Sequence, residues 1–95
     1  MRTLTWFELS RVADGDRVVF TTSWDIPTVV VVPEGTTATV VENGLNEIWS
    51  SMLLKTDNEA VTKALAKWDG MVELAPINMG YDWSDLTPVA LEESK

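Results

Sequence analysis

The sequence predicts a small, mainly β domain with one inserted helix, and three observations support this fold class. Runs of β-branched residues alternate with glycine, proline and asparagine turns, as in "VVVVPEGTTATVVENG" at residues 29–44. One later segment combines a capping box with an apolar stripe of helical spacing. A chain of 95 residues buries roughly 60% of its unfolded surface, which suffices for one core, so we expect a single domain over residues 1–95.

The N-terminal segment, residues 1–13, is expected to contain a short helical turn. Thr5 and Glu8 have the spacing of a capping box. The run Asp14-Gly15-Asp16 interrupts this pattern, so the first strand should start near Asp16 and end at Phe20. A loop over residues 21–28 should follow, in which Pro27 restricts the preceding residue to extended geometry.

The quoted stretch predicts two strands, over residues 29–32 and 36–42. Pro33-Glu34-Gly35 forms a tight turn between them, because proline presets φ and glycine accepts a positive φ. Asn43-Gly44 is a hairpin signal that pairs the second strand with residues 46–55. Alternation along that segment places Ile48, Met52 and Leu54 toward the core and Glu47, Trp49 and Ser51 on the opposite face.

The inserted helix is predicted over about residues 57–68. Thr56 and Glu59 form a second capping box, and Gly70 ends the helix. Its apolar stripe consists of Ala60, Val61, Ala64, Leu65 and Trp68. A strand follows with Val72 and Leu74 inward, and Pro76 ends it. The C-terminal segment, residues 77–95, should contain a last short strand at 89–91.

Five to six short strands between such turns favour a small barrel over a sandwich, which needs more strands. The segments "DGDRVVF", "VPEGTTATVVENG", "IWSSMLL" and "WDGMVELAP" resemble the SH3-like barrels, and in particular small uncharacterised bacterial and phage proteins. The resemblance covers about residues 14–76, although Ala38 stands where the pattern more often has glycine. It implies an SH3-like fold and a habit of binding protein partners, and it carries over no catalytic residue.

Charge and composition exclude several classes of protein. The net charge is −8, and a surface of this sign repels phosphate backbones, so we expect no direct nucleic-acid binding. No apolar run is long enough for a signal peptide or a membrane span, and there is no cysteine. We therefore expect a cytoplasmic protein without membrane contact.

The side chains that most often perform catalysis are missing. The chain has no histidine and no cysteine, which removes the commonest general base, the commonest zinc ligands and the usual nucleophile pairs. The carboxylate pairs Asp14 with Asp16 and Asp82 with Asp85 lie in turn-like segments, where Asp normally binds its own backbone. We expect no enzyme activity, no metal and no cofactor; a carboxylate-dependent enzyme would need two such acids converging in a pocket.

Aromatic residues are the candidate binding residues. Trp24 lies in the loop where SH3-like barrels hold their partner-binding aromatics, and Trp49 is on the face opposite the predicted core. Tyr81 and Trp83 occur in the acidic tail segment "YDWSD". Trp6 and Trp68 are assigned to packing, and any of these rings could simply cover a small core. The resulting hypothesis is a non-catalytic protein-interaction module that binds an unidentified protein, with homodimerisation left open.

The main alternative is an acidic decoy that inhibits a nucleic-acid-binding protein. Residues 57–95 carry eight acidic and only three basic side chains. If the carboxylates form a stripe at phosphate spacing, they would imitate DNA for such a partner; otherwise they serve solubility. The acidic residues of this stripe would be Asp57, Glu59, Asp69, Glu73, Asp82, Asp85, Glu92 and Glu93.

Overall fold

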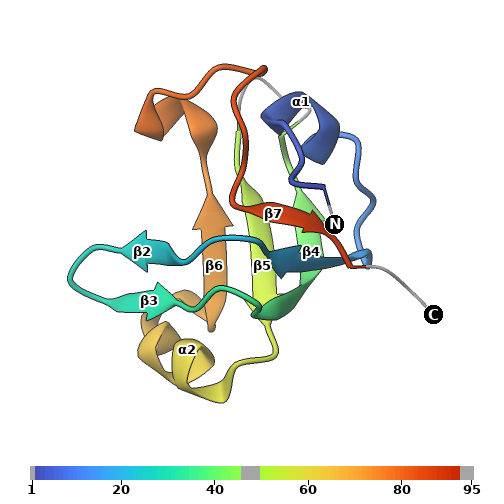
Figure 1. The fold of residues 1–95 in the computed structure, drawn as a ribbon. Helices are drawn as coiled ribbons and strands as arrows, with labels where there is room; N and C mark the ends of the chain where they lie inside the picture. The colour runs from blue at the N-terminus through green and yellow to red at the C-terminus, as the bar shows by residue number, and fades with distance from the viewer. Residues whose placement is uncertain (1, 46–49, 93–95) are drawn as a thin grey trace.

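The computed structural model describes residues 2–45 and 50–92. A five-stranded antiparallel sheet has the order β6-β5-β4-β1-β7, and β2 and β3 form a separate hairpin (Figure 1). The sheet strands are β1 (Arg17–Phe20), β4 (Thr37–Asn43), β5 (Met52–Thr56), β6 (Met71–Leu74) and β7 (Val89–Leu91). The hairpin strands are β2 (Trp24–Ile26) and β3 (Val30–Val32), and the helical segments are α1 (Trp6–Leu9), α2 (Glu59–Ala64) and the 3-10 turns η1 (Ala66–Trp68) and η2 (Pro76–Met79).

The mainly β class with an inserted helix is confirmed, whereas the expected barrel of five to six strands is wrong in two respects. Seven strands lie within the described residues, because the segment predicted as a loop contains β2. The five-stranded sheet is also open, with β6 and β7 at its two edges, so the described strands do not close into a barrel. The last strand was placed correctly at residues 89–91.

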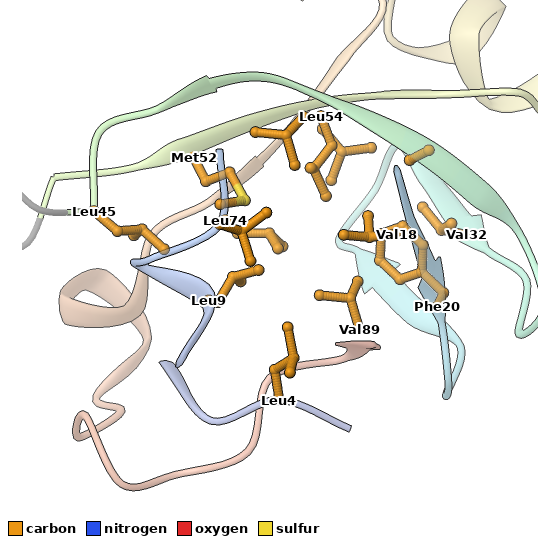
Figure 2. Close-up of a cluster of buried hydrophobic side chains, with 14 of the residues drawn as sticks. Leu4, Leu9, Val18, Phe20, Val32, Leu45, Met52, Leu54, Leu74 and Val89 are labelled. Atoms are coloured by element: carbon orange, nitrogen blue, oxygen red, sulfur yellow. The ribbon is translucent and has the colours of Figure 1, made fainter. Parts of the chain in front are cut away.

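One face of the large sheet carries the core. Met52, Leu54, Val72 and Leu74 are fully buried, as the alternation predicted. Figure 2 shows Met52, Leu54 and Leu74 with side chains from both ends of the chain. Ile48, expected on the same face, lies outside the described residues. Trp6 is also fully buried, which confirms its structural role. The other core residues include Leu4, Leu9, Val18, Phe20, Val32 and Val89.

The N-terminal turn has the predicted capping box. The hydroxyl of Thr5 accepts from the Glu8 amide, and the Glu8 carboxylate accepts from the Thr5 amide. The second of these bonds, with a further contribution from Arg2, lowers the pKa of Glu8 below its ordinary value. The capping box thus fixes α1, whose buried Leu9 then enters the core.

The inserted helix starts later than expected. Thr56 lies in β5, where it pairs with Ala38 and is buried, so its hydroxyl does not cap the helix. The cap is Asn58 instead, whose side-chain oxygen accepts from the Val61 amide at 3.2 Å. None of the helices in the described part of the chain is long and apolar enough to cross a membrane.

Neither of the two turn signals in residues 29–44 forms a tight turn between two paired strands. Residues 33–35 do form a turn, but β3 pairs with β2 and β4 pairs with β1 and β5, so the turn joins two sheets. Asn43-Gly44 does not make a two-residue turn. The Gly44 amide donates to the Ser51 carbonyl at 2.9 Å, so these two residues face each other and a longer segment connects them.

Candidate interaction groove

A hollow of about 490 Å³ lies between the β2–β3 hairpin and the β6 side of the large sheet, and we call it the groove. Figure 1 shows β2 and β3 beside β6, with the segments that lead to β1 and β4 crossing in front of β6 and with α2 below. One wall is formed by the hairpin residues 24–29, and the other wall by Leu53, Leu65, Trp68, Met71, Glu73 and Met79. The lining is mostly apolar, as is usual for sites that bind other molecules.

The hairpin wall is shaped by an unusual turn. The Val29 amide donates to the Ile26 carbonyl at 3.0 Å, with Pro27 and Thr28 between them. Thr28 has φ of +64°, which is rare for a β-branched residue. Proline followed by a positive φ is the arrangement of a type II turn, in which glycine normally takes the position of Thr28. Backbone strain of this kind is most common at binding and active sites.

Trp24 packs this hairpin against the core and also lines the groove. Its side chain is half-buried and packs against the hydrophobic core. It also lines a second hollow of about 330 Å³, together with Tyr81 and residues 86–88. The position of Trp24 in β2, and not in a flexible loop, gives its ring a fixed place between the two hollows.

The opposite wall contains an aromatic residue that the sequence analysis assigned to packing. Trp68 is 53% exposed and lines the groove. The helical stripe failed to predict this because α2 ends at Ala64 and Trp68 lies in the 3-10 turn η1, to which the periodicity of an α-helix does not apply. Asp69 and Gly70, which follow directly, both have positive φ and end the helical segment.

The other candidate binding residues do not gather in the groove. Tyr81 is half-buried, and its ring centroid lies 5.5 Å from that of Trp6. Trp83 is half-buried against the core, and its carbonyl accepts from the Phe7 amide at 3.0 Å. Trp49 lies outside the described residues. Of the four predicted residues, the structure brings Trp24 to the groove and Tyr81 next to Trp24 in the smaller hollow.

The groove has a negative rim. Asp25 and Glu73 are its charged lining residues, and both are exposed. Neither forms an ion pair within residues 2–45 and 50–92. Their carboxylates therefore remain available to a cationic group.

The carboxylate pairs considered for catalysis contain residues that accept hydrogen bonds from backbone amides. Asp16 accepts from the Ala13 amide at 3.1 Å, and Asp14 accepts from the Asn43 amide at 2.8 Å. In the C-terminal segment Asp85 accepts from the amide of Asp82 at 2.8 Å. In the part of the chain that the structure describes, no three acidic side chains converge to hold a metal ion.

No protein-family model, no curated protein and no solved structure matches the chain.

Proposed function

We propose that the protein is a non-catalytic protein-interaction module that binds its partner in the groove. The observation that carries this proposal is the apolar hollow beside Trp24 and Trp68, with two carboxylates at its rim that form no ion pair within the described residues. Exposed tryptophan beside a hollow is typical of binding hot spots, because a large ring buries much area with little loss of conformational entropy. A cytoplasmic location without direct nucleic-acid binding belongs to the same proposal.

An SH3-like topology is part of the proposal. Support comes from the strand order, in which β4, β5 and β6 pair in sequence while β7 returns to pair with β1. The β2–β3 hairpin occupies the connection between β1 and β4, where the resemblance places partner-binding aromatics, and it contains Trp24. In this SH3-like topology the sheet would be open between β6 and β7.

The acidic decoy has less support. Asp57 and Glu92, two residues of the expected stripe, share the guanidinium of Arg17. Their charge is therefore partly neutralised, and Asp85 is engaged by the backbone of its own turn. Glu93 lies outside the described residues. The groove offers a more specific surface than these carboxylates do.

The proposal can be tested by photo-crosslinking in the native host. A benzophenone amino acid is placed at Trp68, in the groove, and in a matched strain at Phe7, which has a similar exposed fraction of 55% and lies on α1. Figure 1 shows α1 and α2 well apart. We expect a crosslinked partner from position 68 and none from position 7, and loss of that partner with Trp24→Ala.

The alternatives give different results in the same experiment. Equal crosslinking from positions 68 and 7, or none from position 68, would rule out the groove as the binding surface. A DNA-binding partner that is lost on reversing the charges of Asp82 and Asp85, and kept with Trp24→Ala, would favour the decoy. Crosslinks between two copies of the chain would identify a homodimer.

A further inference from the structure

We infer that the free edge of β6 accepts an extended, positively charged peptide segment as a sixth strand of the sheet. This inference rests on the proposed function, because Met71 and Glu73 of β6 line the groove. β6 is the outermost strand on its side of the sheet. An extended peptide that lies in the groove would therefore run beside a strand edge, where main-chain hydrogen bonds add to side-chain contacts.

The direction of the backbone groups in β5 follows from two hydrogen bonds at its ends. The Asp57 amide donates to the Thr37 carbonyl at 2.9 Å, and the Gly44 amide donates to the Ser51 carbonyl at 2.9 Å. In both bonds the residue on the β5 side, Asp57 or Ser51, has an odd number. Because backbone groups alternate in direction along a strand, the odd-numbered residues of β5 face β4 and the even-numbered residues face β6.

The same alternation identifies the free groups of β6. Leu54 of β5 faces β6, where it lies opposite Val72. Val72 therefore exchanges its hydrogen bonds with β5, and Met71 and Glu73 direct their N–H and C=O groups away from the sheet. Within the described residues, no backbone hydrogen bond outside the strand ladder involves Met71–Leu74. The two residues that line the groove are thus the two whose backbone groups are free to pair.

The other edge of the sheet is occupied. The Leu4 amide donates to the Val89 carbonyl of β7 at 2.9 Å, and the Thr87 amide donates to the Leu4 carbonyl at 2.8 Å. The N-terminal segment therefore covers β7 at Val89, as proteins commonly do with exposed edges. β6 has no comparable cover among the described residues, although it borders an apolar hollow.

The negative charge of the groove favours a positively charged peptide. Asp25 and Glu73 line it, whereas Lys67, the neighbour of Trp68 in the chain, does not. A strand places alternate side chains on opposite sides, so a peptide with alternating apolar and basic residues would present apolar groups to Trp68 and cations to the two carboxylates. A second copy fits poorly, because both chains carry −8 and pairing of two β6 edges would bring acidic residues together.

Amide hydrogen exchange of the ¹⁵N-labelled full chain tests the inference directly. The probe is a synthetic octapeptide of alternating valine and lysine. In the free protein the Met71 and Glu73 amides should exchange at least about tenfold faster than those of Val72 and Leu74. Addition of the peptide should slow the two outward amides by about tenfold or more. A peptide with the same sequence but N-methylated at the residues that face β6 should give no slowing, because its methyl groups block the approach of the two backbones and it has no N–H to donate to the Met71 and Glu73 carbonyls.

Two variants separate charge from backbone pairing. Glu73→Gln should weaken binding of the lysine peptide by about two- to fivefold, the size of an exposed ion pair, and Glu34→Gln, outside the groove, should not. Met71→Pro removes an outward N–H that the ladder does not use and should abolish binding while the amide spectrum stays folded. If the proline variant unfolds, the N-methylated peptide provides the same test on the intact chain.

The outcomes distinguish this inference from the proposed function. Peptide-induced shifts at Trp24 and Trp68 without slowing of Met71 and Glu73 would retain the groove and overturn strand addition. No spectral change at about 1 mM peptide would rule out a basic peptide as the ligand of this edge. The crosslinking experiment would then still test whether the groove is the binding surface. If the Met71 and Glu73 amides exchange slowly and the protein sediments as a dimer, a second copy of the chain covers the edge. This result would also overturn the inference that a peptide binds there.

Discussion

Arg17 on β1 donates to both carboxylate oxygens of Asp57, which lies 40 residues further along the chain. The Nε group of the same guanidinium donates to Glu92 at 3.1 Å, and the Thr37 hydroxyl also donates to Asp57. The hydrogen bond from Arg17, followed by that from Thr37, lowers the pKa of Asp57 to about 2 and raises that of Arg17. One cation therefore ties together the strands β1, β4, β5 and the end of β7.

Asp57→Asn should lower the free energy of unfolding at neutral pH by less than about 1 kcal/mol, because the pair is half exposed. The pKa of Asp57 is depressed from 3.8, so its stabilisation is complete above that pH and is lost as the pH falls through about 2. Urea unfolding should therefore show a gap between wild type and variant at neutral pH that closes near pH 2. Asp25→Asn, which removes no ion pair among the described residues, is the control. A gap that persists at pH 2 would contradict the assignment.

Thr28→Gly should raise the free energy of unfolding by about 0.5–1 kcal/mol. A left-handed backbone costs a β-branched residue roughly 1–2 kcal/mol, and the greater unfolded-state freedom of glycine offsets part of the gain. Thr28→Ala keeps a Cβ at φ of +64° and should give no gain. Thermal unfolding of the two variants makes the comparison. Equal stability of the glycine and alanine variants would show that this turn is not strained.

Asn43→Ala should lower the free energy of unfolding by about 1–3 kcal/mol. The side-chain amide of Asn43 donates to three carbonyls, those of Leu9, Ser10 and Val12, at 3.1, 3.2 and 2.6 Å. Its oxygen accepts from the Leu45 amide at 3.1 Å. Asn43→Asp keeps this acceptor and loses the donors, so it should be at least as destabilising as alanine in urea unfolding. An aspartate variant as stable as wild type would mean that the three donated bonds contribute nothing.

Thr87→Val should cost about 1–2 kcal/mol and loosen the cover of β7. The buried hydroxyl of Thr87 donates to the Leu4 carbonyl at 2.9 Å and accepts from the Val89 amide at 3.2 Å. Hydrogen exchange should therefore accelerate at the Leu4 amide more than at amides of β5. The exposed Thr22→Val provides the control. Uniform acceleration over the whole chain would indicate a global loss of stability and no local role.

Local chemistry was predictable from the sequence to a large extent. The capping box of Thr5 and Glu8 depends on residues three apart, and the inward faces of β5 and β6 depend on alternation within one strand. Pairing between distant segments was not predictable in the same way. Thr56 had the spacing of a helix cap, but its pairing with Ala38 across β4 and β5 placed it in a strand, and Asn58 became the cap.

The candidate site was predicted in part. Trp24 was singled out as a contact residue, and the structure places it in the groove wall. The groove itself required knowledge of tertiary structure, because it lies between a hairpin that ends at Val32 and a strand edge that begins only at Met71. Trp68 was assigned to packing because helical periodicity was extended through a 3-10 turn, where it does not hold.

The cover on β7 also has a consequence for assembly. If both edges of the sheet were free, the β6 edge of one molecule could pair with the β7 edge of the next, and such head-to-tail pairing produces open filaments and no closed oligomer. The N-terminal segment prevents this by engaging Val89 and Thr87. Strand addition at β6 is therefore a terminal event with a stoichiometry of one, and a chain that lacks the N-terminal segment through Leu4 would gain the ability to polymerise.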